Sequence, residues 1–256
     1  MEVHHHSKPG NLPAGQAGKK LKEYFLEFLM IFLAVTLGFF AENMREHISN
    51  HAREVSYIRG IVSDLQADTS EIKQAKSVQD LLLKHFNAAL AIPPKQLSNA
   101  ALQDSFYHHY MYFYSFTSYF VARNKTSSQL QNGNALAIIS QQDVIDSISE
   151  LNRYYDYYIR VDNDAYTTLY EKKNDAGAKV ISCPPFLTSV SDPVPSISHD
   201  LPIFIANDLT PTIELYNYIN MEKGQMKQCM AVQEIYKIKA ERLIAFINKR
   251  YHFEGE

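Results

Sequence analysis

The sequence predicts an all-α protein, in which an N-terminal transmembrane helix runs into a long amphipathic helix and an antiparallel helical bundle. Three observations lead to this prediction. A stretch near the N-terminus is continuously apolar, the residues after it carry apolar side chains at heptad spacing, and prolines and capping residues divide the rest into segments of helical length. No strand pattern of comparable length occurs in the sequence.

The apolar stretch is residues 28–41, FLMIFLAVTLGFFA, fourteen residues without a charge. Extended to residues 24–43 it has twenty residues, which is about the length that crosses the hydrocarbon core of a bilayer. We expect an uncleaved signal anchor there, preceded by a disordered basic tail over residues 1–23. A buried core helix is an alternative, whereas a cleaved signal peptide is disfavoured because Phe39 stands where the cleavage site requires a small residue.

The basic residues on either side of the anchor predict its orientation. Four lysines precede it and three arginines follow it, namely Lys8, Lys19, Lys20, Lys22, Arg45, Arg53 and Arg59. The segment KKLK at residues 19–22 lies directly beside the anchor, and cytoplasmic flanks carry the excess of positive charge. We therefore expect a cytoplasmic N-terminus, with the helical domain of residues 44–256 on the periplasmic side of a bacterial inner membrane.

Small residues within the anchor are a first candidate surface for self-association. Ala34, Gly38 and Ala41 fall on one helical face, and small residues at such spacing let two helices approach closely. Small residues are also common in any membrane helix, so the pattern has a second explanation.

A heptad seam beyond the anchor is the other candidate surface. Six of its eight a and d positions are apolar, which is typical of a coiled coil; the eight are Ile48, His51, Val55, Ile58, Val62, Leu65, Thr69 and Ile72. The seam packs either on later helices of the same chain or on a second copy. In the second case the self-association residues are Ile48, Val55, Ile58, Val62 and Leu65.

Prolines and capping residues set the remaining boundaries. Pro93 and Pro94 end the long helix, since proline lacks a backbone N–H and disfavours helix at the preceding residue. Ser98 is the expected N-cap of a helix over residues 99–123. Ser140 with Asp143 predicts the start of a helix to about residue 173, with one apolar face formed by Val144, Ile148, Leu151 and Tyr155.

Thr210 as N-cap, followed by Pro211, predicts the last helix, which runs towards Tyr251. Its apolar residues include Ile213, Tyr216, Met230, Ile235, Ile238 and Leu243. The proline-rich segment of residues 175–210 before it is long for a connection inside a compact domain. We expect a lid or a packing loop there.

Nine aromatic residues occur among the fifteen of residues 106–120, FYHHYMYFYSFTSYF. A surface of this kind stacks flat ligands or sugars, whereas a helix with aromatic side chains all round is ordinarily buried in a bundle. The second interpretation is the more common one. His108 and His109 are adjacent and point in different directions on a helix, which is unfavourable for binding one metal together.

Metal, disulfide and catalytic patterns are weak in this chain. His47, His51 and Glu54 stack three possible metal ligands on one helical face, but their pattern lacks the general base of a zinc protease motif. Cys183 and Cys229 are the only cysteines, and they would form one disulfide if the domain lies in an oxidising space. No phosphate-binding loop, nucleophile elbow or catalytic acid cluster is present, so we expect no enzyme activity and no cofactor.

The chain resembles a family of uncharacterised single-pass membrane proteins common in Bacteroidota. The resemblance covers residues 24–155 and rests on ENMRE at 42–46 and IVSDLQAD at 61–68, with further matches at TSSQL (126–130), Asn132–Asn134, Ile138-Ile139 and Asp146–Ile148. Members of that family often carry Trp just after the anchor, where this chain has Met44. The resemblance implies a membrane protein with a helical soluble part and implies no activity.

Taken with a composition of 46% hydrophobic and 21% charged residues and a net charge of −3, these patterns exclude a disordered tail protein and do not support nucleic-acid binding. We expect a membrane-anchored interaction subunit that associates with itself or with a protein partner. The alternative hypothesis is an extracytoplasmic ligand-binding sensor that uses residues 106–120 and the proline-rich segment.

Overall fold

The computed structural model describes residues 14–115, 117, 119–123, 126, 138–181 and 208–253. Every element of regular structure in these ranges is helical, so the all-α prediction is confirmed. The first helix, α1 (Ala14–Leu90), is continuous, but the chain divides into two compact units, residues 1–54 and residues 55–256. Each unit is described by itself.

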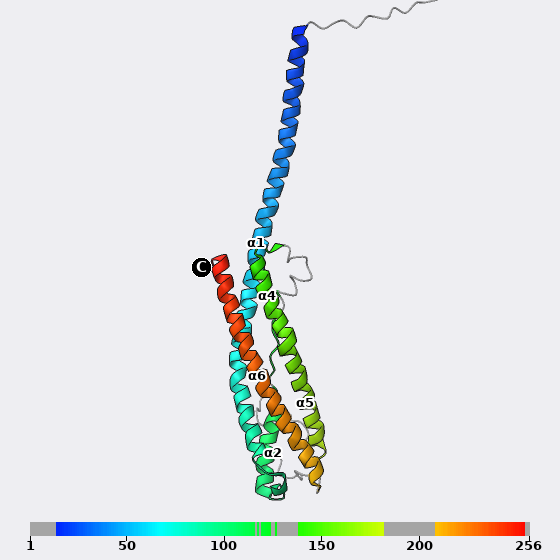
Figure 1. Ribbon diagram of the computed structural model, residues 1–256, viewed down its shortest axis with the longest axis vertical. Helices are drawn as coiled ribbons and strands as arrows, with labels where there is room; N and C mark the ends of the chain where they lie inside the picture. The colour runs from blue at the N-terminus through cyan, green and yellow to red at the C-terminus, as the bar shows by residue number, and fades with distance from the viewer. Residues whose placement is uncertain are drawn as a thin grey trace, which may run out of the picture. The chain divides into compact units, whose positions relative to one another are not determined.

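The second unit is an antiparallel helical bundle (Figure 1). It contains the end of α1, then α2 (Ala100–Ser115), α4 (Gln142–Tyr154), α5 (Arg160–Ala178) and α6 (Leu209–Tyr251). Helix α6 packs along both α5 and α4. The direction follows from paired contacts, because Asp162 near the start of α5 binds Gln225 while Lys179 after its end binds Glu214.

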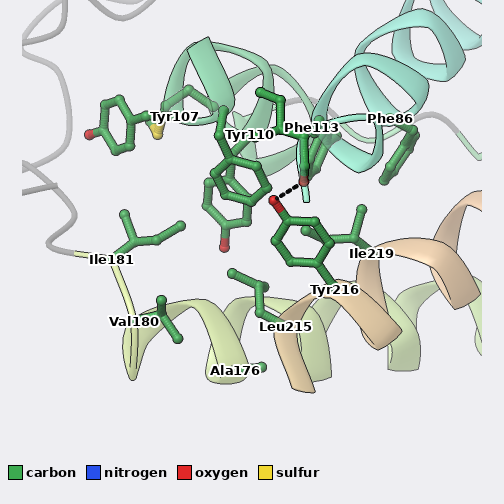
Figure 2. Close-up of a cluster of buried hydrophobic side chains, with 14 of the residues drawn as sticks. Phe86, Tyr107, Tyr110, Phe113, Ala176, Val180, Ile181, Leu215, Tyr216 and Ile219 are labelled. Carbon is green, nitrogen blue, oxygen red and sulfur yellow. Dashed lines mark hydrogen bonds between the residues drawn. The ribbon is translucent and has the colours of Figure 1, made fainter. Parts of the chain in front are cut away.

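Two apolar clusters form the core of the bundle. The first joins α1, α2, α5 and α6, and Figure 2 shows side chains of Phe86, Tyr110, Ala176 and Leu215 from these four helices turned towards one another. The second joins α1, α4 and α6 through residues such as Ile58, Val144 and Leu243. Each large apolar side chain buried in this way contributes about 1.5–3 kcal/mol.

The heptad seam packs on its own chain. Ile58, Val62 and Leu65 are 0%, 9% and 6% exposed and belong to the second cluster, where α4 and α6 cover them. Their apolar face is therefore covered within the chain, as the first of the two interpretations predicts, and their role in self-association stays a prediction. Val55 is half-buried, and Ile48, in the first unit, is exposed.

The end of α1 and the bounds of α2 agree in part with those predicted from the sequence. Helix α1 ends at Leu90 and a short 3-10 turn, η1 (Pro94–Gln96), follows, as Pro93 and Pro94 predict. The next helix is capped by Asn99 rather than Ser98, since the Asn99 Oδ1 accepts hydrogen bonds from the N–H groups of Ala101 and Leu102. Its end at residue 115 is earlier than the predicted 123.

The helix predicted from residue 140 contains a π-helical turn in its middle. Helix α4 continues through one π-helical turn, η3 (Tyr155–Ile159), into α5, which ends at Ala178. The predicted cap is wrong, because Gln141 is the N-cap residue and makes no capping bond with its side chain. The predicted apolar face is confirmed, with Val144, Ile148 and Leu151 buried.

The last helix begins two residues earlier than predicted, with Asp208 as its N-cap through a bond from the Thr210 N–H to its Oδ1. It ends at Tyr251, where His252 adopts a left-handed conformation with φ of 55°. Of the six apolar residues expected on it, Ile213, Ile235 and Ile238 are exposed. The segment predicted as a loop, 175–210, begins later than expected, because residues 175–178 are helical. Residues 182–207 lie outside the described ranges.

Candidate functional site

The first unit exposes a long apolar surface. Its most apolar 18-residue window has a mean hydropathy of 2.1 and is 0% buried. Large apolar side chains are exposed along it, among them Leu26, Phe28, Ile31, Phe32, Val35, Leu37 and Phe40. The helix is long and apolar enough to cross a membrane, and a signal sequence would have the same properties.

The small residues of this helix remain open. Ala34, Gly38 and Ala41 are all exposed, and a Cβ atom added at Gly38 would meet nothing within 4 Å. No residue of the described chain therefore obstructs close approach of a second helix at this position.

The possible metal ligands do not form a site. His51 Nδ1 lies 3.6 Å from Glu54 Oε2, one turn farther along the same helix. Among the described residues, which include His47, His51 and Glu54, no group of three or more His, Cys, Asp or Glu side chains is arranged to hold a metal ion.

The proposed disulfide partner Cys183 lies outside the described residues. Cys229 is buried on α6, where its Sγ donates a hydrogen bond of 3.4 Å to the carbonyl oxygen of Asp162. Burial raises the pKa of the Cys229 thiol to about 12. Such a thiol is a poor nucleophile at neutral pH.

The aromatic segment forms part of the core. Phe106, Tyr110 and Phe113 are each 0% exposed and pack in the first apolar cluster, together with Tyr107 and Met111 (Figure 2). The buried interpretation of residues 106–120 is therefore confirmed for these side chains. The sensor hypothesis requires a free surface on which a ligand can stack, and these buried side chains do not form one.

A charged pair lies inside the bundle. Lys173 of α5 and Glu222 of α6 are both 0% exposed, and the Lys173 Nζ is 3.0 Å from the Glu222 Oε2. Burial lowers the pKa of Lys173 and raises that of Glu222, while their mutual attraction opposes both shifts. The Nζ also donates a hydrogen bond of 2.6 Å to the carbonyl oxygen of Phe113.

This pair holds the end of α2. The last carbonyl groups of a helix have no partner within the helix, and here α5 supplies two of the missing donors. Lys173 binds the Phe113 carbonyl, and the Tyr170 hydroxyl donates to the Tyr114 carbonyl at 2.8 Å. Farther along, the Asn163 Nδ2 donates to the Phe120 carbonyl at 2.6 Å. These contacts give hydrogen-bond donors to carbonyl groups at the end of α2 and after it.

A second buried acid lies between α1 and α6. Asp68 is 0% exposed and accepts hydrogen bonds from the Arg123 N–H at 2.9 Å and from the Tyr236 hydroxyl at 3.0 Å. Burial raises the pKa of Asp68 to about 6, and the nearby carboxylates of Glu71 and Asp64 add to that rise. The two hydrogen bonds act in the opposite direction.

An exposed group of tyrosines lies beside basic residues on α4, η3 and α6. We call it the tyrosine surface, and it is lined by Glu150, Arg153, Tyr154, Tyr157, Tyr158 and Lys239, around a hollow of about 370 Å³. Tyr157 is 73% exposed and Tyr158 is 50% exposed. The Tyr154 and Tyr158 ring centres are 4.8 Å apart, and the Lys239 Nζ is 5.5 Å from the Tyr154 ring centre.

Sequence reasoning did not find the buried pair, Asp68 or the tyrosine surface. Lys173 and Glu222 belong to different helices, and no local spacing relates them. The signal that was available is the run Tyr154-Tyr155-Asp156-Tyr157-Tyr158, which contains four tyrosines in five positions. More tyrosines occur there than one face of a helix can bury.

Comparison with known proteins gives no relative. No protein-family model, no curated protein and no solved structure matches this chain.

Proposed function

We propose that this protein is a single-pass membrane protein that anchors a helical bundle and acts as an interaction subunit, binding a protein partner or itself. The observation that carries the proposal is the exposed apolar helix of the first unit, of which 0% of the most apolar window is buried. An apolar surface of this length requires a covering, and the hydrocarbon core of a bilayer has the matching thickness.

The proposal places the anchor at residues 24–43 in a bacterial inner membrane, with the bundle on the periplasmic side. Its support is the KKLK segment at residues 19–22, next to the apolar stretch. The resemblance to the Bacteroidota membrane family belongs to the same proposal.

Cysteine labelling tests this topology. In a full-length Cys183→Ser/Cys229→Ser background, the exposed residue Ser149 on α4 is replaced by cysteine, and Ser7 of the tail serves as the matched cytoplasmic position. A membrane-impermeant maleimide should label Ser149→Cys in intact spheroplasts and Ser7→Cys only after lysis. The reverse pattern would contradict the orientation. Release of the protein by alkaline carbonate would contradict the anchor.

The tyrosine surface is the proposed contact for a protein partner. Tyr and Arg are enriched at the centres of protein interfaces, because they bury large areas at low entropic cost and form hydrogen bonds at the same time. Tyr157 and Tyr158 expose their rings beside Arg153 and Lys239, which gives the surface this composition.

Affinity purification of the full-length protein from gently solubilised membranes tests this contact. A stoichiometric partner should be retained by the wild type, and its recovery should fall about tenfold in Tyr157→Ser/Tyr158→Ser. The matched control is Tyr119→Ser, at an exposed tyrosine outside the surface. Equal recovery from both variants would exclude the tyrosine surface as the contact.

Self-association is tested at Gly38. If Ala34, Gly38 and Ala41 form a helix–helix contact, Gly38→Ile should lower the oligomer size measured by light scattering in detergent, because the added side chain prevents close approach. A wild type that is monomeric, or an unchanged oligomer in the variant, would count against self-association through this face.

A further inference from the structure

Three histidine rings gather where α1 packs against α2. The ring centre of His85 on α1 is 5.1 Å from that of His109 and 6.1 Å from that of His108, both on α2. The Nδ1 atoms of His85 and His109 are 2.9 Å apart. In the part of the chain that the structure describes, no carboxylate forms an ion pair with any of the three. Pairing with an acid therefore does not account for this cluster.

The distance between the two Nδ1 atoms suits two ligands of one metal ion. Imidazole nitrogens bind a metal ion at about 2.0–2.1 Å, so two nitrogens bound at a right angle are about 2.9 Å apart and two bound at the tetrahedral angle about 3.4 Å. Right-angle coordination by nitrogen is typical of Cu²⁺ and Ni²⁺. A hydrogen bond, in which one Nδ1 donates to the other, has a similar length. The ion takes the place of the proton in that bond.

Both rings are in the state that a metal ion requires. Burial and the neighbouring histidines lower the pKa of His85 to about 4, and burial with the nearby His108 lowers that of His109. The two rings are therefore neutral at neutral pH, and the neutral ring is the form that binds a metal. Each side chain is only half-buried, so an ion reaches it from solvent. The Tyr112 ring stacks on His85 with 3.6 Å between the ring centres, which holds the His85 ring in place.

We propose that His85 and His109 bind a divalent transition metal ion, Cu²⁺ or Ni²⁺, through their Nδ1 atoms. Water molecules complete the coordination, since the described residues form no group of three ligands. The ion links α1 to α2 within the second unit. The neighbouring His108 is not a ligand, in agreement with the expectation that adjacent histidines on a helix do not share one metal. The site does not depend on the proposed membrane topology.

Titration of the full-length protein in mild detergent with Ni²⁺, and separately with Cu²⁺, tests the proposal. Histidines elsewhere that would compete for the probe are first replaced, namely His4→Ala, His5→Ala, His6→Ala, His47→Ala and His51→Ala. In this background we expect one ion per chain. We also expect a rise in melting temperature of about 5 °C at a hundredfold excess over the dissociation constant, because the ion binds the folded protein.

Single variants in this background identify the ligands. His85→Ala and His109→Ala should each weaken binding at least about tenfold and abolish the rise in melting temperature. The matched control is His108→Ala, which removes the exposed neighbour of His109 on the same helix and should leave both quantities unchanged. Circular dichroism without metal should give the same helical content for all three variants, since none of the three side chains is fully buried.

The electron paramagnetic resonance spectrum of the Cu²⁺ complex is an independent measurement. Coupling to two nitrogen ligands is expected in the background protein, and coupling to at most one in His85→Ala or His109→Ala. Absence of binding by either ion at about 1 mM, a thousandfold above a micromolar affinity, would overturn the proposal and leave the hydrogen bond as the role of the pair. Unchanged affinity in His85→Ala, or loss of binding in His108→Ala, would overturn the two-histidine site as well.

Discussion

Lys173 occupies a position where a cation is tolerated only because its partners are present. Replacing it with methionine leaves the Glu222 carboxylate buried without its cation and the Phe113 carbonyl without its donor. We expect Lys173→Met to lower the free energy of unfolding by about 3–5 kcal/mol. Urea unfolding followed by circular dichroism measures this loss.

The double variant Lys173→Met/Glu222→Leu is the informative control. Removing both charges from an apolar interior is often neutral or stabilising, so the double variant should regain at least half of the loss in the single one. If Lys173→Met alone unfolds at the same urea concentration as the wild type, the pair has no structural role.

Asp68 should give the protein a defined dependence of stability on pH. Its pKa is raised from 3.8 to about 6 in the folded state, so between these values the folded protein keeps a proton that the unfolded chain has lost. The contribution of this group to stability therefore falls as pH rises from about 4 to 6. Asp68→Asn does not titrate, and its amide retains an oxygen for the Arg123 N–H.

The quantity to follow with pH is the difference in free energy of unfolding between Asp68→Asn and the wild type. The free energy of unfolding of Asp68→Asn minus that of the wild type should increase across this pH range, by at most about 3 kcal/mol. Chemical denaturation at intervals of half a pH unit measures it. A difference that stays constant with pH would show that Asp68 has an ordinary pKa.

At the scale of the helices, the contact of α5 with α2 depends on Gly177. A Cβ atom added there would lie 2.1 Å from the Tyr110 hydroxyl oxygen, and Tyr110 is 0% exposed and packed in the first apolar cluster. Gly177→Ala should lower the free energy of unfolding by about 1–3 kcal/mol through overpacking.

Gly224 on α6 is the matched control, since a Cβ atom added to it meets nothing within 4 Å. Alanine is favoured over glycine inside helices, so Gly224→Ala should stabilise the protein by about 0.5–1 kcal/mol. Opposite signs for the two substitutions, read from thermal unfolding, are the expected result. A stabilising Gly177→Ala would contradict the close packing of α5 on α2.

The elements that sequence predicts well are those set by local chemistry. The prolines at 93 and 94 end α1, and the face of Val144, Ile148 and Leu151 is buried because its spacing is helical. Caps are harder, since Asn99 and Ser98 are both good N-cap residues and adjacent positions compete.

The buried polar positions could not be predicted from local patterns. On α6, Glu222 and Gln233 occupy the buried face while Ile213 and Ile235 are exposed, which reverses the usual order of polarity. Each buried polar group is stabilised by a partner on another helix, Lys173 for Glu222 and Gln79 for Gln233. Such pairings connect residues that are distant in the chain, so no spacing rule reveals them.

At the scale of the whole molecule, the two units differ in what covers their apolar residues. Ile58, Val62 and Leu65 are covered by α4 and α6 within the second unit, whereas the apolar residues of the first unit have no cover among the residues that the structure describes. Deleting residues 1–54 should therefore give a water-soluble monomer with the helical content of a bundle. Size-exclusion chromatography with light scattering, in buffer without detergent, measures its mass.

A soluble dimer of this deletion variant would show that copies associate through the second unit. Aggregation in the absence of detergent would show that the bundle also needs residues of the first unit. The full-length protein is the matched control, and it should require detergent to stay in solution.

The π-helical turn Tyr155–Ile159 has a consequence for length variation in this chain. Removing one residue from a helix turns everything after it by about 100° and shifts it by about 1.5 Å. Deletion of one residue within a π-helical turn instead restores the α-helical hydrogen-bond pattern, because that turn holds one residue more than an α-helical turn. Deletion of Tyr157 would thus leave Asn163, Tyr170 and Lys173 directed at the three carbonyl groups that they bind. The turn is therefore the position at which this helix can lose a residue while α5 keeps its register on α2.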